Sequence, residues 1–119
     1  MTDFFPIGEL IDRYCIAKLK LERTEKNQVE FEFYQTRISS IDTVQIKQQI
    51  ENLYNVHNEI WNLESSLKSG LEDCIPLEEI GRRAIQIRDW NRKRVVIKNE
   101  IADILSDPVR EIKHNHLSE

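Results

Sequence analysis

The longest regular pattern of apolar and polar positions runs from Pro76 to Leu105. Apolar residues recur there at spacings of three and four, which is the period of an α-helix with one buried face. Pro76 suits a first helical turn, and the next proline is Pro108. The pattern predicts one long helix over about 76–105. Its stripe comprises Leu77, Ile80, Ala84, Ile87, Asn91, Arg94, Lys98, Ile101 and Leu105.

The middle of this stripe is polar, although both of its ends are apolar. Asn91, Arg94 and Lys98 occupy three consecutive stripe positions that should face the core. A buried charge requires an opposite charge or a ligand as its partner. We therefore expect polar groups elsewhere in the protein to meet these three side chains.

A second long pattern predicts a helix over about 43–69, with Asp42 or Thr43 at its N-cap and Gly70 after its end. Its stripe is also interrupted by polar residues, His57 and Glu64. The members of this stripe are Ile46, Ile50, Leu53, His57, Ile60, Glu64 and Leu67. Since a short connection joins the two long helices, we expect them to pack antiparallel.

Folding the chain at that connection places Glu64 about opposite Arg82, and His57 about opposite Asp89. Both stripes are therefore interrupted at mid-length, on facing helices. This coincidence predicts a polar layer inside the bundle.

The first part of the chain predicts two further helices. The first covers about 6–26, and its acids Glu9 and Asp12 are three residues apart and share a face. Such a pair can hold Mg²⁺ through water, or can bind Arg and Lys of another helix. Over residues 27–41, alternating apolar residues would also fit a strand, but a lone strand would lack a partner, so we predict a helix.

These patterns together predict an all-α fold, an antiparallel bundle of about four helices. We expect a single domain over residues 1–119, with a short irregular tail from about 107. The 32% of charged residues, with three Gly and three Pro, favours long helices over a turn-rich sandwich. We expect no signal peptide and no membrane span. Cys15 and Cys74 lack CxxC spacing, so we expect a reducing, cytoplasmic location.

Charge is concentrated in one segment of the chain. Between Arg82 and Lys98 there are seven basic residues and one acid, Asp89, whereas the whole chain has a formal net charge of −4. The overall acidity argues against a general nucleic-acid-binding function. We expect Arg83, Arg92 and Lys93 to be solvated, and Arg94 and Lys98 to be buried.

Three stretches, PIGELIDRYCIAKLKLER, NVHNEIWNLE and RDWNRKRVVIKNEI, resemble a family of small bacterial all-helical proteins without an assigned activity. Ser65 replaces an acid typical of that family, and Lys68 stands near an expected Arg. Members are similar to proteins encoded near polysaccharide or nucleotide-sugar enzymes, which hints at a phosphorylated ligand. The family positions fall on Glu9, Asp12, Lys20, Glu22, Arg23, Asn58, Trp61, Glu64, Asn91, Arg94 and Lys98.

Three functions are compatible with these patterns. In the first, a polar seam between the first, third and fourth helices binds a phosphorylated small molecule such as a nucleotide or nucleotide sugar, because Arg suits phosphate. Trp61, Trp90 or Tyr14 would stack on its ring. The expected ligand-binding residues are His57, Trp61, Arg82, Arg88, Asn91, Arg94 and Lys98. The expected polar network around them comprises Glu9, Asp12, Glu22, Asn58, Glu64 and Asp89.

In the second, the protein is a Mg²⁺-dependent nucleotide pyrophosphohydrolase, with Glu9 and Asp12 as candidate metal ligands. The paired-acid motifs of such helical enzymes do not occur in the central helices, so we lean against an enzyme. In the third, the polar layer is a buried ionic network that fixes helix register, and the protein is a structural or adaptor protein. Aromatic residues on several helix faces are compatible with a homo-oligomer in each case.

Overall fold

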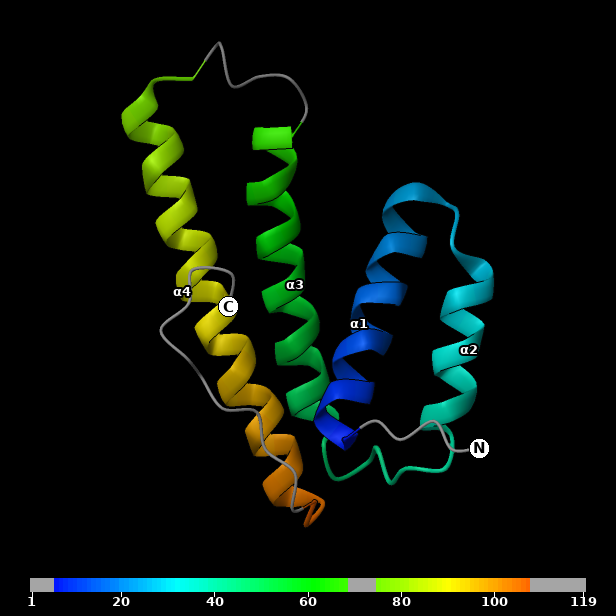
Figure 1. The fold of residues 1–119 in the computed structure, drawn as a ribbon. Helices are drawn as coiled ribbons and strands as arrows, with labels where there is room; N and C mark the ends of the chain where they lie inside the picture. Colours follow the sequence, from blue (N-terminus) through cyan, green and yellow to red (C-terminus); the bar gives the residue numbers. More distant parts are fainter. Residues whose placement is uncertain (1–5, 69–74, 108–119) are drawn as a thin grey trace.

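The computed structural model describes residues 6–68 and 75–107, and within these ranges the chain forms four α-helices (Figure 1). They are α1 (Ile7–Thr24), α2 (Gln28–Ile38), α3 (Lys47–Lys68) and α4 (Leu77–Ile104). The all-α prediction is confirmed, including the helical state of the segment that also fitted a strand. The expected tail from about 107 lies almost wholly outside the described residues.

The two longest helices, α3 and α4, run antiparallel, as their short connection requires (Figure 1). Helix α1 packs against both of them, and α2 packs back against α1. As a result, α1 is the helix that joins the long hairpin to the rest of the molecule. Among the described residues, no helix has the length and apolar character that a membrane crossing requires.

Three helix boundaries differ from the predicted ones. Helix α1 ends at Thr24, where Glu25 adopts φ 58° and donates its backbone N–H to the Leu21 carbonyl. Helix α2 ends at Ile38, three residues early. Helix α3 begins at Lys47, four residues late, because residues 43–46 close a turn in which the Ile46 N–H reaches the Thr43 carbonyl at 3.2 Å.

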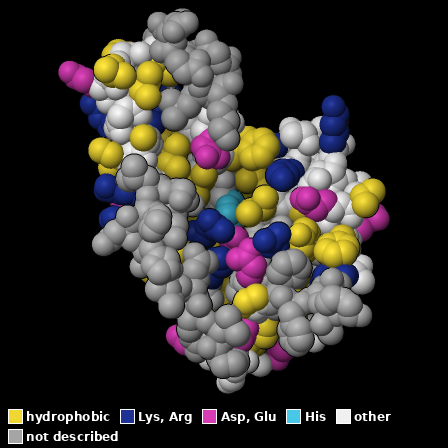
Figure 2. Space-filling model, viewed as in Figure 1, with side chains coloured by type: hydrophobic (Ala, Val, Ile, Leu, Met, Phe, Trp, Pro, Cys, Tyr) yellow, Lys and Arg dark blue, Asp and Glu magenta, His cyan; other side chains and the backbone are white. Residues whose placement is uncertain are grey.

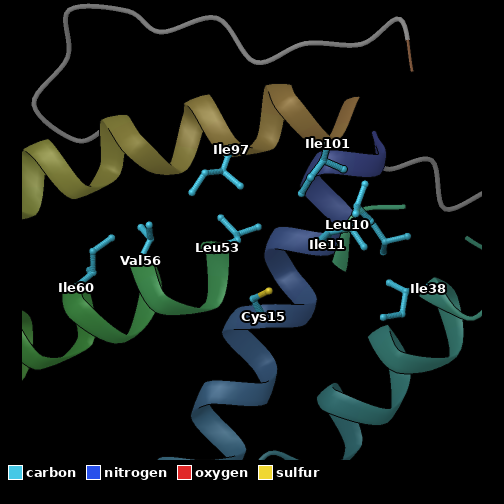
Figure 3. Close-up of a cluster of buried hydrophobic side chains, with 10 residues drawn as sticks. Leu10, Ile11, Cys15, Ile38, Leu53, Val56, Ile60, Ile97 and Ile101 are labelled. Carbon is cyan, nitrogen blue, oxygen red and sulfur yellow. The ribbon is translucent and has the colours of Figure 1, made fainter. Parts of the chain in front are cut away.

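The apolar core lies where all four helices meet, and its side chains point toward one another (Figure 3). In α4 the buried residues all lie between Val95 and Ala102. The prediction that Leu77 faces the core is therefore wrong: its exposed fraction is 83%, because the first turn of α4 precedes the packed part of this helix. The labelled core residues are Leu10, Ile11, Cys15, Ile38, Leu53, Val56, Ile60, Ile97 and Ile101.

The first turn of α1 lies unusually close to α4. A Cβ atom added to Gly8 would stand 2.8 Å from the backbone oxygen of Lys98, closer than real Cβ atoms approach. In addition, the Ile7 N–H donates a hydrogen bond of 2.7 Å to Asp107 Oδ2 just beyond α4. These contacts fix the N-terminus of α1 against α4 and set the depth at which the next polar residues of α1 lie.

Candidate functional site

The most deeply buried acid is Asp12 on α1, whose exposed fraction is 0%. Arg94 of α4 binds both of its oxygens, with Nε 2.9 Å from Oδ1 and Nη2 2.8 Å from Oδ2. His57 of α3 approaches the same carboxylate, with Nε2 2.6 Å from Oδ1. One carboxylate thus connects three helices.

Burial alone would raise the pKa of Asp12, but the hydrogen bonds from His57 and Arg94 outweigh it and lower the pKa from 3.8 to about 2. Asp12 is therefore ionised at neutral pH and can only accept hydrogen bonds. It follows that His57 carries a proton on Nε2 and donates it to Asp12. The arrangement is a charge-assisted pair with an additional imidazole donor.

A second ion pair lies one helical turn earlier on α1. Lys98 of α4, with an exposed fraction of 4%, places its Nζ 2.8 Å from Glu9 Oε1. Arg13 binds the other oxygen of Glu9 through Nε at 2.8 Å. Burial raises the pKa of Glu9. The hydrogen bond and the charge of Lys98, together with the hydrogen bond from Arg13, lower the pKa by more, so it lies below its ordinary value.

We call Glu9, Asp12, His57, Arg94 and Lys98 the ionic layer. The sequence patterns place all five in the polar seam, and the structure brings them together between α1, α3 and α4. Basic and acidic side chains are seen side by side in the middle of the face in Figure 2. Within this layer, each acid has at least two direct donors from the protein itself.

A groove of about 300 Å³, which we call the α1–α2 groove, opens beside the ionic layer. Its lining carries three basic and three acidic side chains, so its formal charge is balanced. Lys20 and Glu30 face each other across it at 3.8 Å. The lining residues are Glu9, Asp12, Arg13, Ile16, Lys20, Glu30, Tyr34 and Arg94.

Three further polar contacts join α1 to α3 nearer the C-terminal end of α1. Arg23 donates hydrogen bonds to Asn58 and, at 3.0 Å, to Asn62. Tyr54 donates its hydroxyl proton to Glu22; burial and this contact raise the pKa of Tyr54 to about 12. Glu22 and Asn58, both expected in the polar network, thus join α1 to α3 at a separate place from the ionic layer.

Most basic side chains of the basic segment of α4 pair with acids, although four acids serve six of them. Within the described residues, six of its seven basic side chains form an ion pair with an acid, and Lys93 is the seventh. Arg82 and Arg83 bind Glu79, and Arg88 and Arg92 bind Asp89. Lys93 instead lies 4.1 Å from the ring centre of Trp90.

The predicted facing pairs are therefore replaced by other partners. His57 binds Asp12 of α1 rather than Asp89, and Arg82 binds Glu79 within its own helix rather than Glu64. Arg82 reaches Glu79 because residues three apart on a helix are neighbours, and His57 reaches Asp12 because α1 packs against α3 as well as α4. Arg82 and Arg88 consequently lie outside the ionic layer.

The remaining expected residues lie near the layer or along α3. Asn91 accepts a long hydrogen bond of 3.5 Å from Arg94 Nη1. Trp61 and Glu64 are partly buried on α3, about one and two turns after His57. Three residues beside the layer are not singled out by the sequence, although the spacing of Glu9 and Arg13 by four residues is a signal for one of them. These three are Arg13, Glu30 and Tyr34, whereas Lys20 is one of the family positions.

Glu9 and Asp12, the candidate Mg²⁺ ligands, both bind basic side chains. Within residues 6–68 and 75–107, no three His, Cys, Asp or Glu side chains gather as metal ligands would. No family model, curated protein or solved structure matches the chain. We therefore infer function from the geometry of the ionic layer and the α1–α2 groove.

Proposed function

We propose that this protein is a helical scaffold or adaptor in which the ionic layer is a structural element. The observation that supports this most is that Arg94 and Lys98 each form an ion pair with an acid of α1. Their positions on the core stripe require a partner for each charge, and α1 supplies Asp12 and Glu9 at 2.8 Å. No external anion is needed to compensate either charge.

A buried ionic network favours one arrangement of helices over its alternatives. Sliding α1 by one turn along α4 would leave Asp12 without Arg94 and would bury unpaired charges on both helices. Apolar contacts alone discriminate less between such registers, because one aliphatic side chain can replace another. The layer thus holds α1, and α2 with it, in a fixed position on the α3–α4 hairpin.

The proposal also accounts for the charge of α4. Within the described residues, Glu79, Asp89 and the two acids of α1 pair with six of the seven basic residues, so these four acids offset part of the positive charge of the helix. Cys15 is a buried free thiol, which suits a reducing compartment such as the cytoplasm.

The experiment that tests this proposal is a thermal-shift screen against nucleotides and nucleotide sugars, each with and without Mg²⁺. A ligand at 100 times its Kd would stabilise the protein by about 2.7 kcal/mol, which is readily detected. We expect an unchanged melting temperature throughout. A saturable stabilisation that disappears in Arg94→Met would contradict a purely structural layer.

The α1–α2 groove favours a second candidate function, the binding of a phosphorylated small molecule. Arg13, Lys20 and Arg94 line it, and a phosphate could take the place of Glu30 on Lys20, since the Lys20–Glu30 pair is long and about half exposed. The matched variant for this reading is Lys20→Met, which leaves the ionic layer intact. A ligand-dependent stabilisation lost in Lys20→Met and in Arg94→Met would establish this second function.

A further inference from the structure

A larger groove lies between α3 and α4 and shares no residue with the ionic layer. This α3–α4 groove measures about 510 Å³. Val56 and Ile97 form part of its apolar lining, and Val96 beside them has an exposed fraction of 57%. The lining residues are Asn52, Asn55, Val56, Trp90, Arg92, Lys93, Val96, Ile97 and Glu100.

Three charged residues of α4 line this groove, Arg92 and Lys93 toward one end and Glu100 toward the other, and Arg92 pairs with Asp89. Lys93 is the basic residue of α4 that contacts Trp90 instead of an acid. Within the described part of the chain, no ion pair is found for Glu100 either. Since these residues are seven apart, they lie on the same face but about 10 Å apart along the axis, too far to pair with each other.

The order of Lys93 and Glu100 along α4 is complementary to the same order in a second α4 that runs antiparallel to the first. In a two-fold symmetric interface, each residue i that contacts residue j is matched by j contacting i. An axis passing α4 between Val96 and Ile97 exchanges position 93 with position 100. Two antiparallel copies of α4 would therefore set Lys93 of each against Glu100 of the other, with the Val96 side chains together at the centre.

We propose that the α3–α4 groove binds a second copy of this chain, forming an antiparallel homodimer. The exposed Val96 of each copy fills the apolar part of the groove, and two reciprocal Lys93–Glu100 pairs fix the direction. An anionic small molecule would be matched by charges of one sign, whereas this groove carries the acid Glu100 as well as the bases Arg92 and Lys93. The inference goes beyond the proposed function and depends on different residues, so either can fail alone.

The test is a charge-reversal experiment read by sedimentation equilibrium. Lys93→Glu places two acids against each other twice per dimer, and Glu100→Lys does the same with two bases. We expect the wild type to be a dimer at about 100 µM. Each single variant should dissociate at concentrations at least about tenfold higher than the wild type does.

Mixing the two variants provides the decisive measurement. In a mixed dimer, the acid introduced at position 93 of one chain meets the base introduced at position 100 of the other. The unchanged Lys93 and Glu100 of the two chains form the second pair. An equimolar mixture should therefore regain wild-type dimerisation, although neither variant does so alone. Lys47→Glu makes the same charge change on an exposed site of α3 outside the groove, and should leave the dimer unchanged.

Far-ultraviolet circular dichroism of each variant confirms that its helices are intact. A monomeric wild type at about 100 µM would overturn the proposal, whatever else the groove binds. Undiminished dimerisation of both single variants, or a mixture that remains monomeric, would overturn it as well.

Discussion

Replacing Arg94 by Met should destabilise the protein strongly, because it leaves a buried carboxylate with half of its partners. Arg94 donates two charge-assisted hydrogen bonds to Asp12, which has no exposed surface. Removing one member of a buried ion pair costs about 3–5 kcal/mol. Since the side chain of Arg94 is 26% exposed, water can partly replace it, and we expect a loss of about 3 kcal/mol.

The assay is urea denaturation at pH 7 followed by circular dichroism, with Arg92→Met as the matched control. Arg92 makes an exposed pair with Asp89 at 3.9 Å, so its removal should change the free energy of unfolding by less than about 0.5 kcal/mol. A loss below about 1 kcal/mol for Arg94→Met, or equal losses for both variants, would refute the reasoning.

The pH dependence offers a second check on the same variant. The folded-state pKa of Asp12 is about 2, below its ordinary value of 3.8. The ionised Asp12 therefore contributes about 2 kcal/mol to the free energy of unfolding above pH 4, and this contribution is lost as the pH falls through about 2. Without Arg94 the pKa of Asp12 in the folded state rises, so the variant loses the contribution of Asp12 to stability at a higher pH than the wild type does. The stability difference between wild type and variant should narrow as the pH falls from about 4 to 2.

Three further predictions concern other contacts. Gly8→Ala should lower the free energy of unfolding by about 1–3 kcal/mol, because its Cβ would meet the Lys98 carbonyl. Gly81→Ala, with open space around it, should raise the free energy of unfolding by up to about 1 kcal/mol. Equal effects of the two variants in urea denaturation would contradict the close approach of Gly8 to α4. Asp107→Ala should lower the free energy of unfolding by about 1 kcal/mol, because it removes the acceptor of the Ile7 N–H at the start of α1. An unchanged melting temperature would contradict a stabilising role of this hydrogen bond. In a Cys74→Ser background, Cys15 should resist alkylation until the protein unfolds, since burial raises its pKa to about 12; rapid alkylation at pH 7 would contradict its burial.

The helices follow from local patterns, and so the sequence predicts them well. Periodic apolar residues and the prolines at positions 6 and 76 are sufficient to indicate α1, α3 and α4. The helix ends are less predictable, because side chains of similar capping ability compete. The sequence offers Asp42 as a cap for α3, but in the structure it accepts a hydrogen bond from the side chain of Gln45 at 2.6 Å, within the turn that delays the helix.

The interhelical pairs are harder to predict than the residues that form them. The core-stripe positions of Arg94 and Lys98 indicate that both need acids, and α1 offers Glu9 and Asp12. Which base meets which acid depends on the depth of α1 against α4, and Gly8 controls that depth through a single close backbone contact. Such a contact has no periodic signature, so the expected pairing of His57 with Asp89 could not be corrected from sequence alone.

The most direct test of the central claim is a double-mutant cycle on Asp12 and Arg94, measured by urea denaturation. Arg94→Met should lose about 3 kcal/mol, because it leaves the carboxylate of Asp12 buried and uncompensated. Asp12→Leu should lose about as much, because it leaves the partly buried Arg94 and the buried His57 without their acceptor. The double variant should lose at least about 2 kcal/mol less than the sum of the two single effects, since an apolar pair can replace a buried ion pair. The loss that remains comes from His57, whose Nε2–H no longer has Asp12 as its acceptor. A double variant that loses the sum of the two single effects would contradict a direct structural pairing within the ionic layer.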